Sequence, residues 1–311
     1  MNQIQTMRPI LFAIIFLGLL SSCVDHAKQA DKNNSLNGSL AVQLYTFRGE
    51  LEKDVPGTLK KIKDLGFEYV EGFDEPYIVG DPDAFKSQLD AAGLKMIALH
   101  WNTLPDWRKD PTVILETAKK LGAQYTGIAW LKESRADTVT LDVVNEAADI
   151  LTKACPQARA MGLQLYYHIH GYELQPINDQ KTFFDSFVSR IDYNCVRLQM
   201  DVFWVTYAGQ DPVKFMDKYR DGVELLHVKN MADHVSTGVF TGADFMPPQM
   251  PADYWVSLGK SKKIDYKSVF KKGREIGVKW YILEMDRFDG DVFAAVDSSL
   301  AYIRKEKLLE P

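Results

Sequence analysis

Four residues of metal-ligand type stand at the ends of short apolar segments in the second half of the chain. They are His168, Asp201, His227 and Glu284. Imidazole nitrogens and carboxylate oxygens together suit Mn²⁺, Co²⁺, Zn²⁺, Fe²⁺ or Mg²⁺. A lone histidine or aspartate in such a place is more often a structural hydrogen-bonding group. Four of them at the same point of four segments predict one divalent metal ion, whose identity the residue types leave open.

Further titratable groups accompany these four. His170, Lys229 and Asp286 each lie two residues beyond a candidate ligand, and Glu71 and His100 end two earlier apolar segments. A metal beside an imidazole and an ammonium group suits removal of a proton next to a carbonyl. We expect His170 to act as the base or acid and Lys229 to hold the oxyanion. Glu71 and His100 are expected to act as a second base or to bind hydroxyls, with solvated or capping roles as the alternative.

Four more residues are expected to bind substrate. Trp204 follows Asp201 by three residues, and a sugar ring stacks well on an indole, although most aromatic side chains of such a chain belong to its core. Gln43, Glu173 and Asp286 are expected to contact substrate hydroxyls. An indole beside several polar side chains that can bind hydroxyls indicates a carbohydrate ligand.

Short apolar runs alternate with longer amphipathic segments about eight times from Ser39 onward. This rhythm predicts stacked strand–helix units. The strands are expected at Leu40–Leu44, Tyr69–Gly72, Lys95–His100, Tyr125–Ala129, Gln164–His168, Val196–Asp201, Val223–Val228 and Trp280–Glu284. The helices are expected at Val55–Leu65, Pro82–Ala92, Thr112–Leu121, Leu141–Met161, Gln180–Ser189, Pro212–Tyr219, Tyr266–Ile276 and Val292–Glu306.

Glycine and Asp-Pro pairs mark the ends of these helices. A glycine is expected at the left-handed C-terminal position of five helices, and an aspartate before a proline is expected to cap the start of three. Eight such units in one region predict a (β/α)8 TIM barrel, whose strand ends gather the chemical groups at one mouth. An open doubly wound sheet is the alternative, but residues 43–49 lack the Gly-rich phosphate fingerprint of many such sheets. The glycines are Gly66, Gly93, Gly122, Gly162 and Gly277, and the aspartates are Asp81, Asp110 and Asp211.

The long connection Met231–Lys263 is expected to overhang the same mouth of the barrel.

The first residues read as a targeting segment. Arg8 precedes an apolar run, Pro9–Leu20, that is too short to span a bilayer. The run leads into Leu-Ser-Ser-Cys, which resembles a bacterial lipobox ending at Cys23. We therefore expect a lipoprotein signal peptide at 1–23, lipidation of Cys23, a flexible tether at 24–38 and anchoring in the bacterial cell envelope facing the periplasm. A signal peptide without lipidation is the alternative.

Bulk composition restricts the partners. The chain has 311 residues, a formal charge of −5 and a pI near 5.7, which leaves no basic field for nucleic acid. Residues 39–311 are expected to form a single domain, with oligomerisation possible. Beyond Cys23, only Cys155 and Cys195 remain. We expect them to be two buried free thiols, with a disulfide between them as the alternative.

Six segments carry a family resemblance, and it covers about residues 40–305. The chain resembles the sugar phosphate isomerase/epimerase family of xylose-isomerase-like TIM barrels. In that family a Glu, Asp, His, Glu quartet commonly holds a metal, and Asp201, His227 and Glu284 match its last three positions. His168 stands where many relatives have Glu, with His170 and Glu173 as substitute ligands, and Asn230 stands where the family tends to have Asp. The segments are residues 42–48, 167–174, 200–204, 209–212, 226–230 and 283–286.

The resemblance implies chemistry on a carbohydrate. Because phosphorylated sugars are metabolised in the cytoplasm, an exported chain is expected to act on an unphosphorylated keto-sugar or sugar derivative. Its enediolate gives isomerisation or epimerisation on reprotonation, whereas expulsion of a β-oxygen makes the chain a 3-keto-glycoside lyase or hydratase. A non-catalytic sugar-binding lipoprotein is an alternative of another class. A related branch that cleaves abasic DNA needs several zinc ions and a basic groove, and it fits this acidic chain poorly.

Overall fold

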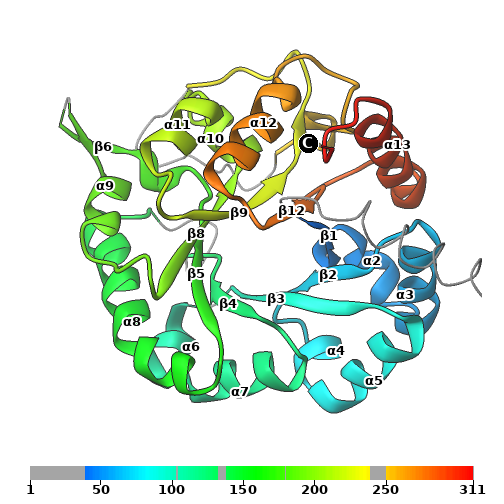
Figure 1. The fold of residues 1–311 in the computed structure, drawn as a ribbon, viewed down its shortest axis with the longest axis horizontal. Coiled ribbons are helices and arrows are strands. Elements are labelled where there is room, and N and C mark those ends of the chain that lie inside the picture. The colour runs from blue at the N-terminus through cyan, green and yellow to red at the C-terminus, as the bar shows by residue number, and fades with distance from the viewer. Residues whose placement is uncertain (1–38, 103, 132–137, 179, 239–249, 311) are drawn as a thin grey trace, which may run out of the picture. The chain divides into compact units, whose positions relative to one another are not determined.

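Eight parallel strands close into a barrel in this computed structural model, which describes residues 39–102, 104–131, 138–178, 180–238 and 250–310. The strands follow one another around the barrel in chain order, and Figure 1 shows the helices on its outside. The predicted (β/α)8 barrel is confirmed, and the open doubly wound sheet is excluded. The expected signal peptide, tether and Cys23 lie outside the described residues. The barrel strands are β1 (Ser39–Gln43), β2 (Tyr69–Gly72), β3 (Lys95–Trp101), β4 (Tyr125–Ile128), β5 (Gln164–His168), β8 (Val196–Asp201), β9 (Val223–Val228) and β12 (Trp280–Leu283).

The helices lie between these strands in sequence. Among the described residues none is long and apolar enough to cross a membrane. The longer helices are α3 (Val55–Asp64), α5 (Pro82–Ala92), α7 (Thr112–Lys120), α8 (Leu141–Ala160), α11 (Pro212–Lys218), α12 (Tyr266–Ile276) and α13 (Val292–Lys305). The shorter ones are α2 (Arg48–Leu51), α4 (Pro76–Val79), α6 (Leu104–Lys109), α9 (Phe183–Val188) and α10 (Val202–Tyr207), with single 3₁₀ turns at η1 (Leu44–Phe47), η2 (Tyr172–Leu174) and η3 (Ala252–Tyr254).

The predicted helix signals are confirmed with two corrections. All five C-terminal glycines have positive φ angles, and Asp81 and Asp211 accept backbone hydrogen bonds as N-caps. At helix α7 the N-cap position is Pro111, one residue later than expected, while Asp110 Oδ1 accepts a hydrogen bond of 2.9 Å from the backbone N–H of Thr112. Helix α9 begins three residues later than predicted, because Thr182 and Asp185 form a reciprocal capping box.

The long connection after β9 contains a small antiparallel pair, β10 (Asn230–Met231) with β11 (Trp255–Val256). Its expected position over the mouth cannot be followed throughout, since residues 239–249 lie outside the described part. A second small pair joins β6 (Pro176–Asn178) to β7 (Lys181–Thr182).

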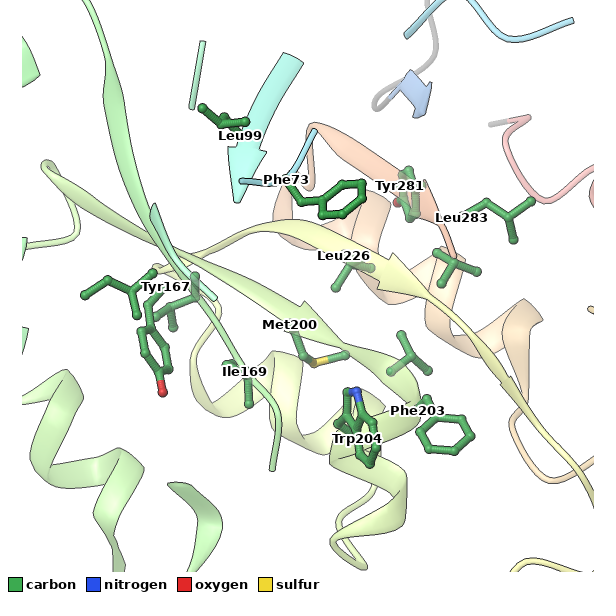
Figure 2. Close-up of a cluster of buried hydrophobic side chains, with 14 of the residues drawn as sticks. Phe73, Leu99, Tyr167, Ile169, Met200, Phe203, Trp204, Leu226, Tyr281 and Leu283 are labelled. Carbon is green, nitrogen blue, oxygen red and sulfur yellow. The ribbon is translucent and has the colours of Figure 1, made fainter. Parts of the chain in front are cut away.

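Alternation along the strands places apolar side chains on the outer face, against the helices, and the candidate ligands on the inner face. Tyr167, Met200, Leu226 and Leu283 are buried in one large apolar cluster with residues of the surrounding helices, as Figure 2 shows. A separate small cluster fills the barrel interior with residues such as Tyr166. Because side chains alternate between the two faces of a strand, the neighbours of the first four residues face the barrel axis. Those neighbours are His168, Asp201, His227 and Glu284.

The two described cysteines form a disulfide between α8 and the residue before β8. Cys155 and Cys195 have a Cα–Cα separation of 5.9 Å and lie 40 residues apart in sequence. The expectation of two free thiols is therefore wrong. The two segments adjoin in the barrel, which their distance along the chain does not reveal. On the loop-entropy model a loop of this length stabilises the fold by about 4 kcal/mol.

Candidate active site

Three of the four predicted ligands form a compact cluster at the carboxyl ends of β8, β9 and β12. Asp201, His227 and Glu284 each offer a ligand atom within 4.8 Å of the other two, and all three are buried. His227 Nδ1 lies 2.6 Å from Glu284 Oε2 and 3.9 Å from Asp201 Oδ2. The local fold aims the aspartate, because Asp201 Oδ1 accepts a hydrogen bond of 3.0 Å from the backbone of Trp204 as the N-cap of α10. Its Oδ2 is thereby turned toward the cluster.

His168 lies at the edge of this cluster. Its Nε2 is 3.8 Å from Asp201 Oδ2. It also belongs to a second possible ligand group with His100 and His227, whose atoms lie within 4.8 Å of one another. His168 therefore stands beside both groups, while burial and the neighbouring histidines lower its pKa well below the usual value. A neutral imidazole of this kind keeps a lone pair for a metal.

The ammonium group of Lys229 forms ion pairs with carboxylates of the same cluster and with Asp286. Its Nζ lies 2.9 Å from Asp201 Oδ2, 2.8 Å from Glu284 Oε2 and 2.6 Å from Asp286 Oδ1. Although burial opposes its charge, these three carboxylates raise the pKa of Lys229 well above the usual value. Burial raises the pKa of Asp286 to about 7, against the opposing effect of Lys229. Asp201 Oδ2 and Glu284 Oε2 therefore face the ammonium group and would also face any ion that the cluster held.

Glu71 lies beneath the cluster and is fully buried. Its Oε2 is 2.5 Å from His227 Nε2, so His227 is held between two carboxylates. Burial raises the pKa of Glu71, but the favourable interactions of its carboxylate with His100 and His227 outweigh burial, and the net shift is downward. Burial lowers the pKa of His227, yet Glu71 and Glu284 raise it to about 10. A metal at His227 Nδ1 would therefore displace a proton.

His100 faces the same space from β3. Its Nδ1 contacts the hydroxyl of Tyr166 and lies 3.6 Å from Glu71 Oε1. Tyr166 reaches this position because Gly127, opposite it on β4, has no side chain. A Cβ there would lie 1.9 Å from the backbone oxygen of Tyr166. Burial lowers the pKa of His100 to about 4, so this imidazole is neutral near pH 7.

Aromatic rings surround His170 beside the candidate ligands. The ring of His170 lies 4.5 Å from His168, 5.1 Å from Trp130 and 6.0 Å from Trp204, between ring centroids. Its Nδ1 is buried and has no hydrogen-bond partner among the described residues. Burial and the charge of Lys229 lower the pKa of His170 well below the usual value. The imidazole is therefore neutral and holds a nitrogen that can accept a proton or a hydroxyl hydrogen bond.

Glu173 and Gln43 occupy different surroundings. Glu173 Oε1 accepts hydrogen bonds from Tyr167 Oη at 2.6 Å and from the backbone of His170 at 3.2 Å, and burial raises its pKa to about 7. Tyr167 belongs to the outer apolar cluster, so the structure does not bring Glu173 to the candidate ligands. Gln43 donates a hydrogen bond of 3.0 Å to Glu71. It therefore lies with Glu71 beneath the candidate ligands.

Three residues of the site were not singled out in the sequence: Gln199, Tyr166 and Trp130. Gln199 and Tyr166 lie two residues before Asp201 and His168, on the same inward faces, so strand alternation could have identified them. Trp130 follows the end of β4 in an irregular segment, where no periodic signal exists.

The donor set fits one divalent ion. Asp201 Oδ2 accepts no hydrogen bond within the described residues, although Lys229 Nζ lies near it as an ion-pair partner. Two carboxylates and one or two imidazoles form a mixed oxygen and nitrogen site of the kind that divalent transition metals prefer. Four carboxylates, those of Glu71, Asp201, Glu284 and Asp286, face the cationic Lys229 and His227. The surplus of negative charge favours a bound cation.

The chain resembles known proteins in both sequence and structure. An inosose dehydratase of Geobacillus kaustophilus (strain HTA426) is 25% identical over 129 residues, which cover 38% of this chain and 41% of that protein. A sugar phosphate isomerase/epimerase from Parabacteroides distasonis ATCC 8503 has a similar structure, with a TM-score of 0.69, 24% identity, and coverage of 87% of this chain and 99% of that one. The IOLI protein, solved with a bound zinc atom, gives a TM-score of 0.58 at 18% identity over 86% of this chain and 95% of that one.

The family model of the xylose isomerase-like TIM barrel matches residues 59–306, which include seven of the eight barrel strands and all four candidate ligands. The match covers most of the described barrel. The chain belongs to the xylose isomerase-like TIM barrel family.

Proposed function

We propose that this protein is a divalent-metal-dependent sugar isomerase or epimerase that acts on an unphosphorylated keto-sugar or sugar derivative. The observation that carries the proposal is the buried cluster of Asp201, His227 and Glu284, with Lys229 and His170 beside it. The dehydratase, isomerase/epimerase and zinc-bound relatives support a metal and a carbohydrate.

The ion, held by Asp201, His227, Glu284 and, at the edge, His168, would supply Lewis acidity to a carbonyl and an adjacent hydroxyl. The chain's own groups handle the proton and the charge. The free Nδ1 of His170 takes the proton from the carbon next to the carbonyl, and the electron pair of that C–H bond forms the new C=C bond. The carbonyl electrons move to oxygen, where the Lys229 ammonium stabilises the enediolate. Trp130 and Trp204 bound the space in which the ring lies.

The same enediolate has two outcomes. Return of the proton from His170 to the neighbouring carbon, with the hydroxyl proton passing between the two enediolate oxygens, gives the isomer. Protonation of the original carbon on its opposite face, by an acid other than His170, gives the epimer. Expulsion of a β-oxygen gives elimination, as in a 3-keto-glycoside lyase or hydratase, and the likeness to an inosose dehydratase supports this second candidate. Both outcomes require the same proton abstraction.

An exported, lipid-anchored location is part of the proposal. The lipobox-like segment ending at Cys23 supports it, and so does the Cys155–Cys195 disulfide, since such bonds persist mainly in oxidising compartments. In that location the protein meets unphosphorylated sugars and glycosides.

Solvent exchange tests the proposal. The Zn²⁺- or Mg²⁺-loaded protein is incubated with 3-keto-glucosides and with free aldoses and ketoses in D₂O, and the products are followed by NMR. We expect deuterium at the carbon next to the carbonyl, with the chelator-treated protein inactive. Loss of the aglycone identifies elimination. Sugar binding without exchange in any substrate would support the non-catalytic sugar-binding lipoprotein instead.

A further inference from the structure

Glu71 is the common acceptor of a buried hydrogen-bond network beneath the cluster of Asp201, His227 and Glu284. Its Oε2 faces Gln43 Nε2 at 3.0 Å and His227 Nε2 at 2.5 Å. Its Oε1 accepts from Gln199 Nε2 at 2.8 Å and from Tyr166 Oη at 3.3 Å. Because a carboxylate only accepts, each of these partners must point a hydrogen at it.

The first consequence concerns His227. Glu71 holds the hydrogen of Nε2, so the opposite nitrogen, Nδ1, is the one that faces Glu284 Oε2 at 2.6 Å and Asp201 Oδ2 at 3.9 Å. The imidazole therefore offers Nδ1, and not Nε2, to an ion in the cluster.

The second consequence reaches His168 through Gln199. Since the amide nitrogen of Gln199 is committed to Glu71, its oxygen must face His168 Nδ1, which lies 2.6 Å away. That nitrogen carries the hydrogen, and the lone pair of His168 is on Nε2, which points toward Asp201 Oδ2 at 3.8 Å. A neutral histidine in water favours hydrogen on Nε2, so the network imposes the less common tautomer.

We propose that Glu71 is a positioning residue that holds a hydrogen on Nε2 of His227 directly and, through Gln199, on Nδ1 of His168. The nitrogens left to bind an ion, Nδ1 of His227 and Nε2 of His168, then both face Asp201. Glu71 then needs no contact with substrate, in place of the second base or hydroxyl-binding role expected for it. Gln199 acts as the relay between Glu71 and His168. The link to metal binding rests on the proposed metal centre, whereas the tautomer of His168 does not.

The decisive variant is Glu71→Gln, which keeps the shape of the side chain. Its single oxygen remains with the two donors that now face Oε2, His227 Nε2 and Gln43 Nε2, so its amide nitrogen faces Gln199. The Gln199 amide must then turn and present its nitrogen to His168 Nδ1. We expect the hydrogen of His168 to move from Nδ1 to Nε2, two hydrogen bonds away from the substitution, and Zn²⁺ affinity to fall about 10- to 100-fold.

The tautomer is read in the metal-free protein from two-bond ¹H–¹⁵N correlation spectra of its histidine rings, and Zn²⁺ affinity is read by calorimetry. Gln199→Met is the second variant, for use if Glu71→Gln does not fold. It removes the acceptor of His168 Nδ1 and is expected to return the hydrogen to Nε2. Glu224→Gln is the matched control. Glu224 is also a buried carboxylate, but it starts β9 at the opposite end of the barrel, where it binds Tyr125, Arg197 and Lys279.

The control should leave the His168 tautomer and the Zn²⁺ affinity unchanged. A His168 that keeps its hydrogen on Nδ1 in folded Glu71→Gln would overturn the inference. A wild-type protein that shows the Nδ1 tautomer but binds no metal would leave the network standing and refute the metal centre, so the two failures are distinguishable.

Discussion

Replacement of His227 by Ala is expected to abolish binding of the divalent ion while the barrel remains folded. The imidazole is the one residue shared by both possible ligand groups, and its Nδ1 lies against Glu284 Oε2. Its loss also removes a cation from between two carboxylates. Glu284→Ala is expected to have the same effect, and Glu284→Gln offers a milder change that keeps the shape while removing the charge.

Metal content after purification and Zn²⁺ affinity by calorimetry check this expectation, with circular dichroism as the test of folding. We expect affinity to fall by at least about 100-fold, since a direct ligand should cost no less than the upper effect of an outer partner. His234→Ala is the control, because His234 is an exposed histidine whose nearest acid is Asp253. Full metal occupancy in the folded His227 and Glu284 variants would refute the ligand assignment.

Replacement of Lys229 by Met is expected to lower turnover about 100- to 1000-fold, the usual cost of removing one preorganised group that stabilises developing negative charge. The ammonium group lies within 2.9 Å of three carboxylates and is almost fully buried. Two of those oxygens belong to the candidate ligands Asp201 and Glu284, so the ammonium would compete with an ion for them. Metal affinity should therefore stay the same or increase as activity falls.

A fall in turnover without a fall in metal affinity distinguishes a lysine that stabilises charge from a lysine that holds the ligands in place. Turnover is measured with the substrate identified by deuterium exchange, and Zn²⁺ affinity by calorimetry. Lys279→Met is the control. Lys279 precedes β12 at the other end of the barrel, and its ammonium pairs with Glu224. Turnover within threefold of the unchanged protein would contradict the role assigned to Lys229.

The fold could be predicted from the sequence almost completely, because each level of local signal agreed with the others. The strands β2, β5, β8 and β9 have the predicted bounds, β3, β4 and β12 differ by one residue at their C-terminal end, and β1 is shifted by one residue at both ends. Alternating apolar residues, C-terminal glycines and N-terminal aspartates act over short distances and are therefore visible in the chain. Helix α9 was placed less well, since its start depends on a side-chain capping box.

The site could be predicted in part, for a physical reason. Strand alternation brings Asp201, His227 and Glu284 together, because all parallel strands of a barrel end at one mouth. It does not reveal which polar neighbours meet across the barrel. Glu71 therefore looked like a second base, while Gln199 was passed over, and the joining of Cys155 to Cys195 depends on the packing of α8 against its neighbours.

The most direct test of the metal centre is anomalous X-ray scattering from a crystal of the barrel soaked in Zn²⁺, measured on both sides of the zinc absorption edge. The account predicts one strong peak within bonding distance of Asp201 Oδ2, His227 Nδ1 and Glu284 Oε2, with Lys229 Nζ withdrawn toward Asp286. A crystal with no peak there, or with its peak on other residues, would contradict it.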